Sequence, residues 1–186
     1  MKVIETPIQG LVILEPKVFE DARGFFYESY NEKRFHELGI KAKFVQDNIS
    51  RSVKGVLRGL HYQLAPFSQG KLVRVSIGEV LDVAVDLRKG SPTFGQSFAV
   101  KLSEQNRLLF WVPEGFAHGF LVLSETAEFN YKVTNYYTPA SDRTLLWNDP
   151  GLKIDWGIHS NEVIISDKDR IGKTLNEAEI NFVFQP

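Results

Sequence analysis

The chain has 186 residues, a length that suits one globular domain, and 43% of them are hydrophobic, which is enough for a sizeable core. Its 22 basic and 23 acidic side chains give a formal charge of −1, so no field of one sign favours nucleic acid or an anionic membrane as a partner. The lack of cysteine excludes a disulfide framework, a thiolate nucleophile and a cysteine-ligated zinc site. No apolar run follows Met1-Lys2, and none approaches about 18 residues, so we expect a cytoplasmic protein.

Short segments rich in β-branched and aromatic residues recur along the chain, and Gly, Pro, Asn and Asp interrupt them at intervals of about 8 to 12 residues. This spacing predicts an all-β fold, an antiparallel sandwich or barrel, in a single domain spanning residues 1–186. In chain order the predicted strands are 11–14, 24–30, 44–50, 56–63, 71–77, 80–87, 96–102, 107–112, 118–124 and 127–137.

One short helix is predicted between the second and third of these strands. Asn31 suits the N-cap, Phe35 and Leu38 share one helical face, and Gly39 ends the helix. Further along, Ile77-Gly78-Glu79-Val80 predicts a hairpin turn between two strands.

The carboxy-terminal segment after Asp149-Pro150 is less periodic than the rest. We expect it to pack over the sandwich as loops, with a short helix near residues 176–180. Within it, Ser166-Asp167-Lys168-Asp169 has the local composition of a turn, where a carboxylate is usually solvated.

Four polar side chains fall on the apolar faces of predicted strands, because residues two apart point the same way. They are Lys71, His118, Tyr131 and Tyr137. An inward His or Tyr is more often a hydrogen-bonded core residue than a catalyst. An inward ammonium group is costly without a counter-charge, so we expect Lys71 to meet a carboxylate, a bound anion or water.

The stretch Leu57-Arg58-Gly59-Leu60-His61-Tyr62-Gln63 places a cation and an imidazole in one predicted strand. A guanidinium binds phosphate or carboxylate oxygens, and histidine is the side chain suited to proton transfer near neutral pH. Arg58 and His61 are three positions apart, so on a regular strand their side chains would point to opposite faces. They face one cavity only if the strand is bulged, and Gly59 is the residue type that tolerates a bulge. The stretch therefore suggests an active site for an anionic substrate.

A metal site built on His61 and His118 is an alternative. The four histidines lie at positions 36, 61, 118 and 159, whereas zinc or iron sites on β-barrels usually combine two or three closely spaced His with a carboxylate. The spacing argues against a metal-dependent enzyme, but this hypothesis stays open.

An ordered set of motifs covers nearly the whole chain. It comprises Asp21-Ala22-Arg23-Gly24-Phe25-Phe26, Gln46-Asp47-Asn48, the stretch 57–63, Lys71-Leu72-Val73-Arg74-Val75, Asp82-Val83-Ala84-Val85-Asp86-Leu87-Arg88, Ser91-Pro92-Thr93-Phe94-Gly95, Gly115-Phe116-Ala117-His118-Gly119-Phe120, Tyr136-Tyr137, Trp147-Asn148-Asp149-Pro150 and Ser166-Asp167-Lys168-Asp169. In this order the motifs resemble the dTDP-4-dehydrorhamnose 3,5-epimerase family.

The resemblance implies a cupin-type jelly roll that works as a homodimer, with neither metal nor other cofactor. It assigns His61 as general base paired with Asp169, Tyr131 as general acid on the opposite face of the sugar, and Lys71 as the contact of the ketone oxygen. The residues that it implies in substrate binding, some of them supplied across the dimer by amino-terminal strands, are Arg23, Phe26, Glu28, Gln46, Asn48, Arg58, Lys71, His118, Asp142 and Lys168.

The activity implied is epimerisation of dTDP-4-dehydro-6-deoxy-D-glucose at carbons 3 and 5. Two alternatives stay open: an epimerase that inverts one carbon of a related dTDP-4-keto sugar, and a nucleotide-sugar binding cupin without turnover.

Three positions depart from the family pattern: Asp142 stands where Glu is usual, Gly157 where Pro is common, and Ile171-Gly172-Lys173 where a segment contains Pro. They bear on ligand contact at Asp142 and on how the tail positions Asp169.

Overall fold

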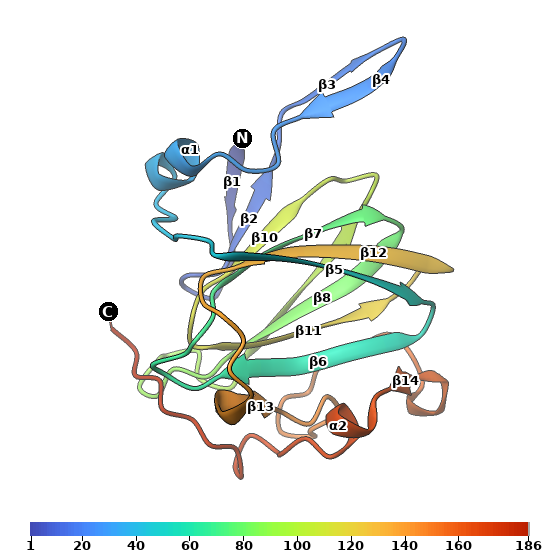
Figure 1. The fold of residues 1–186 in the computed structure, drawn as a ribbon. Coiled ribbons are helices and arrows are strands. Elements are labelled where there is room, and N and C mark those ends of the chain that lie inside the picture. The colour runs from blue at the N-terminus through green and yellow to red at the C-terminus, as the bar shows by residue number, and fades with distance from the viewer. Residues whose placement is uncertain (186) are drawn as a thin grey trace.

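Two facing β-sheets form a sandwich in the computed structural model, which describes residues 1–185 (Figure 1). The first sheet has the order β1-β2-β10-β7-β12-β5, and its strands are β1 (Lys2–Glu5), β2 (Val12–Glu15), β5 (Gln46–Val53), β7 (Lys71–Ile77), β10 (Leu109–Val112) and β12 (Thr126–Val133). The second has the order β13-β6-β11-β8-β9, with β14 added in parallel to β6, and its strands are β6 (Val56–Gln63), β8 (Glu79–Asp86), β9 (Ser97–Ser103), β11 (Phe116–Val122), β13 (Asp142–Thr144) and β14 (Ile164–Ile165).

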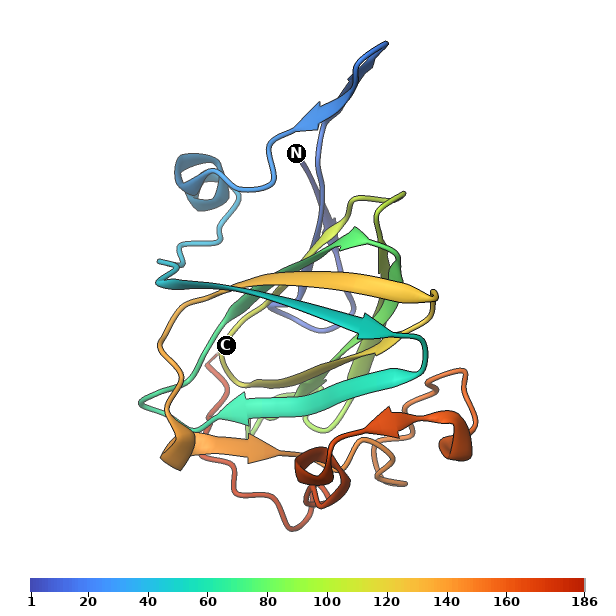
Figure 2. The ribbon, with the colours of Figure 1, turned by 45° about the vertical axis from the view of Figure 1, so that its right-hand side comes forward.

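A two-stranded hairpin of β3 (Val18–Asp21) and β4 (Gly24–Tyr27) projects away from the sandwich, as Figures 1 and 2 both show. Two short helices complete the fold, α1 (Glu32–Glu37) and α2 (Asp167–Arg170), with single 3-10 turns at Pro139–Ser141 and Ser160–Glu162. None of the helices in residues 1–185 is long and apolar enough to cross a membrane.

All ten predicted strands are present, with ends shifted by a few residues, and the all-β prediction is confirmed. The sequence missed β1, β3, β13 and β14, which have four residues or fewer and so carry little alternation to detect. The predicted hairpin at Gly78 is wrong, because β7 and β8 belong to different sheets and the turn passes from one layer to the other.

The predicted helix at Asn31 is confirmed as α1: the Asn31 side chain accepts a hydrogen bond from the backbone N–H of Arg34, and Phe35 is buried against the outer face of the first sheet. The helix predicted near residues 176–180 is wrong, since that segment forms turns. A helix forms instead at α2, where Ser166 accepts a hydrogen bond from the backbone N–H of Asp169 and so caps a segment predicted as a turn.

Two apolar layers hold the second sheet in place. Its inner face packs against side chains of the first sheet such as Val73, Phe110 and Phe129. Its outer face is covered by the carboxy-terminal segment, which contributes Trp156 and Phe182. The tail therefore packs over the sandwich, as predicted, and brings α2 into contact with β6.

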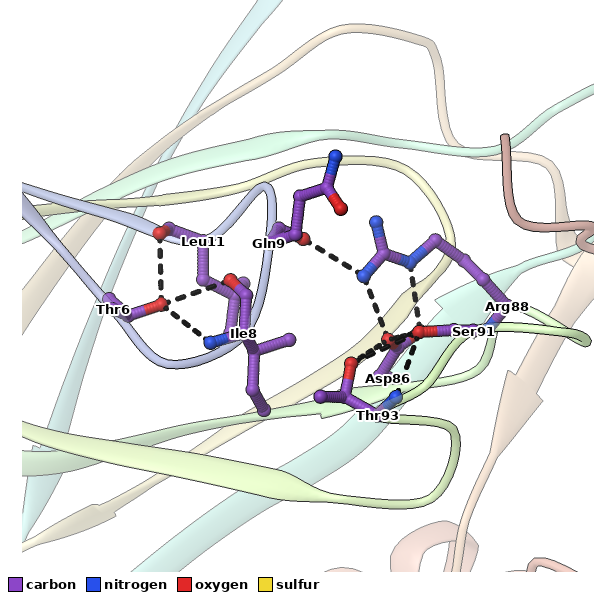
Figure 3. Close-up of polar contacts among 8 residues, drawn as sticks. All are labelled: Thr6, Ile8, Gln9, Leu11, Asp86, Arg88, Ser91 and Thr93. Atoms are coloured by element: carbon purple, nitrogen blue, oxygen red, sulfur yellow. Dashed lines mark hydrogen bonds and ion pairs between the residues drawn. The ribbon is translucent and has the colours of Figure 1, made fainter. Parts of the chain in front are cut away.

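A buried carboxylate ties together the loops at one end of the sandwich (Figure 3). Asp86 is fully buried and accepts hydrogen bonds from the Arg88 guanidinium and from the hydroxyls of Ser91 and Thr93, while Arg88 also donates to the carbonyl of Gln9. Burial alone would raise the pKa of Asp86, but the hydrogen bonds from these donors outweigh it. The pKa is therefore lowered, and the carboxyl group stays ionised. Every oxygen of this cluster is engaged, which marks it as structural.

Candidate active site

A cavity of about 560 Å³ opens between the two sheets. Its lining consists of Ser50, Val56, Leu57, Arg58, His61, Lys71, His118, Gly119, Phe120, Phe129, Tyr131, Ile164, Ile165, Ser166, Lys168 and Asp169. Seven of these residues were predicted from the sequence: Arg58, His61, Lys71, His118, Tyr131, Lys168 and Asp169. They come from β6, β7, β11, β12 and α2, so the cavity exists only where both sheets and the tail meet.

A bulge in β6 brings Arg58 and His61 to the same cavity. In the pairing of β11 with β6, His118 lies opposite His61 but Phe120 lies opposite Arg58, so β6 carries one extra residue between the two pairs. Gly59 sits in that bulge with φ +139, and a Cβ there would lie 2.5 Å from the Cα of Gly119. The bulge predicted at Gly59 is confirmed, and the reason for glycine is both its backbone angle and the close strand behind it.

Asp169 reaches His61 from the carboxy-terminal tail. Its Oδ1 lies 2.6 Å from His61 Nε2, and its Oδ2 accepts a hydrogen bond of 3.3 Å from the backbone N–H of Gly59. Burial raises the pKa of Asp169, whereas the bonds from His61, Gly59 and the Ser166 cap lower it to below the usual range. The solvated turn suggested by local sequence is wrong here, because Asp169 is only 4% exposed.

Tyr131 and Lys71 face His61 from the other sheet. Tyr131 lies on β12, and burial raises the pKa of its hydroxyl, so it is protonated at neutral pH. The ammonium of Lys71, on β7, donates a hydrogen bond of 3.3 Å to the carbonyl oxygen of His61. Burial lowers the pKa of Lys71 to about 8, although Asp142 and Asp82 act in the opposite direction.

His118 forms a second histidine–carboxylate pair beside the first. Its Nε2 lies 2.8 Å from Oδ1 of Asp82, and both side chains are buried. Burial lowers the pKa of His118 against the opposing effect of Asp82, so the ring is neutral at pH 7. The sequence reasoning did not select Asp82, although strand parity places it on the inward face of Val80 and Ala84 and could have found it.

Two cations border the more open part of the cavity. Arg58 is held by a hydrogen bond of 3.1 Å from its Nε to the hydroxyl of Ser52, which leaves the terminal nitrogens of its guanidinium to bind an anion. Lys168 reaches the lining from α2, where its ammonium contacts the carboxylate of Asp142. Asp142 also accepts a hydrogen bond from the Tyr137 hydroxyl at 3.0 Å, and it is not among the residues that line the cavity.

Six of the predicted binding residues do not line the cavity. Arg23 and Phe26 lie on the β3–β4 hairpin, Glu28 bonds to Asn31, Gln46 bonds to Asn48 at 2.8 Å on β5, and Asp142 holds Lys168. Asn48 lies directly opposite Tyr131 in the β5–β12 ladder, so it is next to the cavity wall.

Tyr137 was predicted on an inward strand face, which is wrong: β12 ends at Val133 and Tyr137 is 56% exposed.

The sequence reasoning missed part of the lining. Ile164 and Ile165 form an apolar wall on β14, a strand too short to predict, and the rings of Phe120 and Phe129 stack with centroids 4.0 Å apart. Among the described residues, His, Cys, Asp and Glu form no group of three or more that could hold a metal ion.

Comparison with known proteins points to one enzyme family. Residues 5–177 match the family model described as dTDP-4-dehydrorhamnose 3,5-epimerase. The chain is 57% identical over 179 residues to the dTDP-4-dehydrorhamnose 3,5-epimerase of Salmonella typhimurium, covering 96% of this chain and 97% of that protein.

Solved structures agree with that match. The crystal structure of dTDP-6-deoxy-D-glucose-3,5-epimerase from Legionella pneumophila, in complex with dTDP-4-keto-L-rhamnose, is 54% identical with a TM-score of 0.95, covering 100% of this chain and 99% of that one. A 3′-monoepimerase from Streptomyces bikiniensis, in complex with dTDP-quinovose, is 31% identical with a TM-score of 0.85, covering 92% and 86%.

Proposed function

The chain belongs to the dTDP-4-dehydrorhamnose 3,5-epimerase family, with the cupin-type jelly roll that the sequence implied, and from this we propose how its own residues perform the reaction. It is an isomerase that converts dTDP-4-dehydro-6-deoxy-D-glucose to dTDP-4-dehydro-L-rhamnose in dTDP-L-rhamnose biosynthesis. The sugar enters the cavity between the sheets, where His61 is the base, Tyr131 the acid and Lys71 the cation at the ketone oxygen.

The position of the base and the acid on different sheets is the observation that carries this assignment. His61 comes from β6 in the second sheet, and Tyr131 comes from β12 in the first. A ring held between them presents one face to each, so a proton removed by His61 is replaced from the opposite side by Tyr131, and the carbon is inverted. A single residue on one wall returns the proton to the face from which it came.

The base is prepared by Asp169. With Asp169 at Nε2, the ring keeps its proton there and leaves a lone pair on its other nitrogen. The carboxylate also stabilises the imidazolium that forms when His61 takes the proton. Because Asp169 is buried, solvent screens this charge pair less than it screens a pair at the surface.

Most of the reduction in activation free energy must come from stabilising the negative charge that develops on the ketone oxygen. A proton next to a ketone is less acidic than imidazolium by about a dozen pKa units, or about 16 kcal/mol, before the enolate is stabilised. A positioned base contributes about 10²- to 10⁴-fold, or about 3 to 5 kcal/mol, so a cation in a dry site must supply much of the rest. Lys71 is such a cation, held 3.3 Å from the His61 carbonyl, and the proposed mechanism therefore uses neither metal nor nicotinamide.

The diphosphate binds at the open side of the cavity. Arg58 presents a guanidinium fixed by Ser52, and Lys168 follows from α2. Guanidinium groups bind phosphate oxygens in bidentate fashion, and an ammonium adds a point charge. We assign both cations to positioning of the nucleotide, which orients the sugar toward His61.

A homodimer completes the binding site in this proposal. Arg23 and Phe26 lie on the β3–β4 hairpin, which extends away from its own sandwich (Figure 2). The side chains of Phe25 and Phe26 are 58% and 70% exposed. An exposed aromatic hairpin of this kind is typical of an interaction surface. The hairpin of one copy reaches the cavity of the other, where Arg23 and Phe26 contact the nucleotide.

Solvent labelling tests the reaction. Turnover in deuterium oxide should place deuterium at carbons 3 and 5 of the sugar, read by mass spectrometry and NMR. Label at carbon 3 alone would replace this proposal with a one-carbon epimerase, and tight dTDP binding without turnover would indicate a binding module. Dialysis against a chelator should leave kcat unchanged, and a loss restored by a divalent metal would contradict the metal-free mechanism.

Mixed dimers test the hairpin. Asp169→Asn inactivates the cavity of its own subunit, and Arg23→Ala in the hairpin impairs the cavity of the other. Mixing the two variants forms heterodimers in which one cavity has both an intact dyad and an intact hairpin, so activity should rise above that of either variant alone. No recovery after subunit exchange would refute the crossing of the hairpin.

A further inference from the structure

A single arginine outside the cavity joins the β3–β4 hairpin to the sandwich. Arg107 lies in the loop between β9 and β10, and its Nη1 donates a hydrogen bond of 3.0 Å to the Glu20 carboxylate on β3. Its guanidinium carbon lies 4.3 Å from the centroid of the Phe25 ring on β4. Within residues 1–185, the hydrogen bond, the ion pair and the cation–π contact that link residues 17–27 to the rest of the protein all come from Arg107.

The two residues that Arg107 contacts share one face of the hairpin. Glu20 and Phe25 are directly opposite one another in the β3–β4 ladder, and side chains opposite one another in an antiparallel pair point the same way. The neighbouring pair, Phe19 and Phe26, therefore points to the other face, where the two side chains are 54% and 70% exposed. Arg107 thus holds one face of the hairpin and leaves this aromatic pair available to a second subunit.

The conformation of Arg107 is one that a residue with a side chain seldom adopts. Its φ is +54, in the left-handed region that favours Gly and Asn. Asn106 holds the loop in this shape, since its Oδ1 accepts hydrogen bonds from the backbone N–H groups of Ser103 and Leu108. The Arg107 side chain is only 20% exposed, and its Nε is buried without a hydrogen-bond partner among residues 1–185. Backbone strain and an unpaired buried nitrogen both cost free energy, and such features cluster where a function depends on the geometry.

We propose that Arg107 is a positioning residue: its guanidinium holds the β3–β4 hairpin in the orientation that delivers Arg23 and Phe26 to the cavity of the partner subunit. Arg107 does not line the cavity itself and acts through Glu20 and Phe25. The ion pair alone would fix the hairpin weakly, because Glu20 is 64% exposed, but a planar guanidinium that pairs and stacks at once constrains both the position and the tilt of the hairpin. The inference rests on the proposed function, since it concerns the crossing of the hairpin between subunits.

Arg107→Asn removes the guanidinium without opposing the backbone, because Asn tolerates the left-handed region. Loss of both contacts lets the hairpin move, so ordering it when the nucleotide binds lowers the affinity. We expect KM for the dTDP-sugar and Kd for dTDP to rise by about 3- to 30-fold, with kcat unchanged within about twofold. Arg107→Lys keeps the charge but not the planar group, and it should give a smaller rise.

Two further variants control this result. Lys153 also has a positive φ, +50, and an exposed side chain, but it lies in the tail that covers the second sheet. Lys153→Asn therefore removes a cation at the same kind of backbone angle, and KM and Kd should stay within about twofold. Glu20→Gln removes only the ion pair, so it should raise KM by itself but add little in the Arg107→Asn background, because both changes break the same contact.

Heterodimers show in which cavity Arg107 acts. Two differently tagged chains are co-expressed and dimers with both tags are purified, with Asp169→Asn in one chain so that nearly all turnover comes from the cavity of the other. In the first arrangement Arg107→Asn is in the Asp169→Asn chain, so the altered hairpin serves the active cavity and KM should rise as in the homodimeric variant. In the second arrangement it is in the chain with the active cavity, and KM should stay at the wild-type value.

The outcomes separate the inference from the proposed function, with Arg23→Ala placed in the same two arrangements as a reference for the crossing. If Arg23→Ala raises KM in the first arrangement and Arg107→Asn does not, the role of Arg107 is refuted while the crossing stands. A rise for both variants in the second arrangement only, or in neither, refutes the crossing and the inference with it. An equal loss of kcat in both arrangements, which a merely structural role would give, also overturns the inference.

Discussion

Asp169→Asn isolates the charge of the proposed dyad at nearly constant volume. The carboxylate has two oxygens, of which one faces His61 Nε2 at 2.6 Å and the other accepts from the Gly59 N–H at 3.3 Å. An amide offers oxygen to only one of these partners and places NH₂ toward the other. The variant therefore loses the charge next to the imidazolium and also one hydrogen bond to the β6 bulge.

The expected loss follows from the distance. Two unit charges about 4 Å apart interact by about 4 kcal/mol at an effective dielectric constant of about 20. The His61 side chain is 31% exposed, so solvent reduces this figure, and we expect a loss of about 2 to 3 kcal/mol in transition-state stabilisation. That corresponds to about 30- to 150-fold in kcat. KM should change little, because Asp169 acts on His61 and not on the nucleotide.

Steady-state turnover of dTDP-4-dehydro-6-deoxy-D-glucose measures this effect, with thermal unfolding to confirm that the variant is folded. Asp167→Asn is the matched control: it removes a charge from the same helix, but its exposed side chain does not line the cavity, so kcat should stay within about twofold. A folded Asp169→Asn enzyme with kcat within threefold of wild type would refute the dyad, and a loss confined to KM would assign Asp169 to substrate binding.

Three further predictions address the acid, the cation and the bulge. Tyr131→Phe should lower kcat by about 10²- to 10⁴-fold, while recovered substrate still gains solvent deuterium because the base is intact; unlabelled substrate would contradict separate base and acid. In the wild type, kcat/KM should fall as pH rises through about 8, because burial lowers the pKa of Lys71 to about 8 and the neutral amine cannot stabilise an enolate; a flat profile up to pH 10 would argue against this role. Gly59→Ala should cost about 2 kcal/mol or more of unfolding free energy in urea, because its Cβ would lie 2.5 Å from the Cα of Gly119. Gly90→Ala, with φ +85 but open space around its Cβ, should cost only about 1 kcal/mol, and equal losses would show that the close approach at Gly59 is unimportant.

Local patterns were sufficient for most of the fold. The strand 71–77 was placed with its exact ends, since its hydrophobic alternation is regular, and α1 was located by the Asn31 cap and the Gly39 stop. The same alternation placed Lys71 and His118 inside the sandwich. A regular strand would point Arg58 and His61 to opposite faces, so a shared cavity required a bulge at Gly59, and β6 contains that bulge. The turn at Gly78 was misread because a turn signal does not say which sheet receives the next strand.

The sequence by itself therefore determined the strands, the inward polar residues and, through an ordered set of motifs, the enzyme family. The tertiary structure decided which of those residues meet. Asp169 and His61 are 108 positions apart, and Asp169 is buried in a segment that looks locally like a solvated turn only because the tail packs across β6. Likewise, His61 and Tyr131 face one another because their strands lie in opposite sheets. Periodicity is set by neighbouring residues along the chain, whereas charge pairing across a cavity depends on packing between distant segments, which no local pattern encodes.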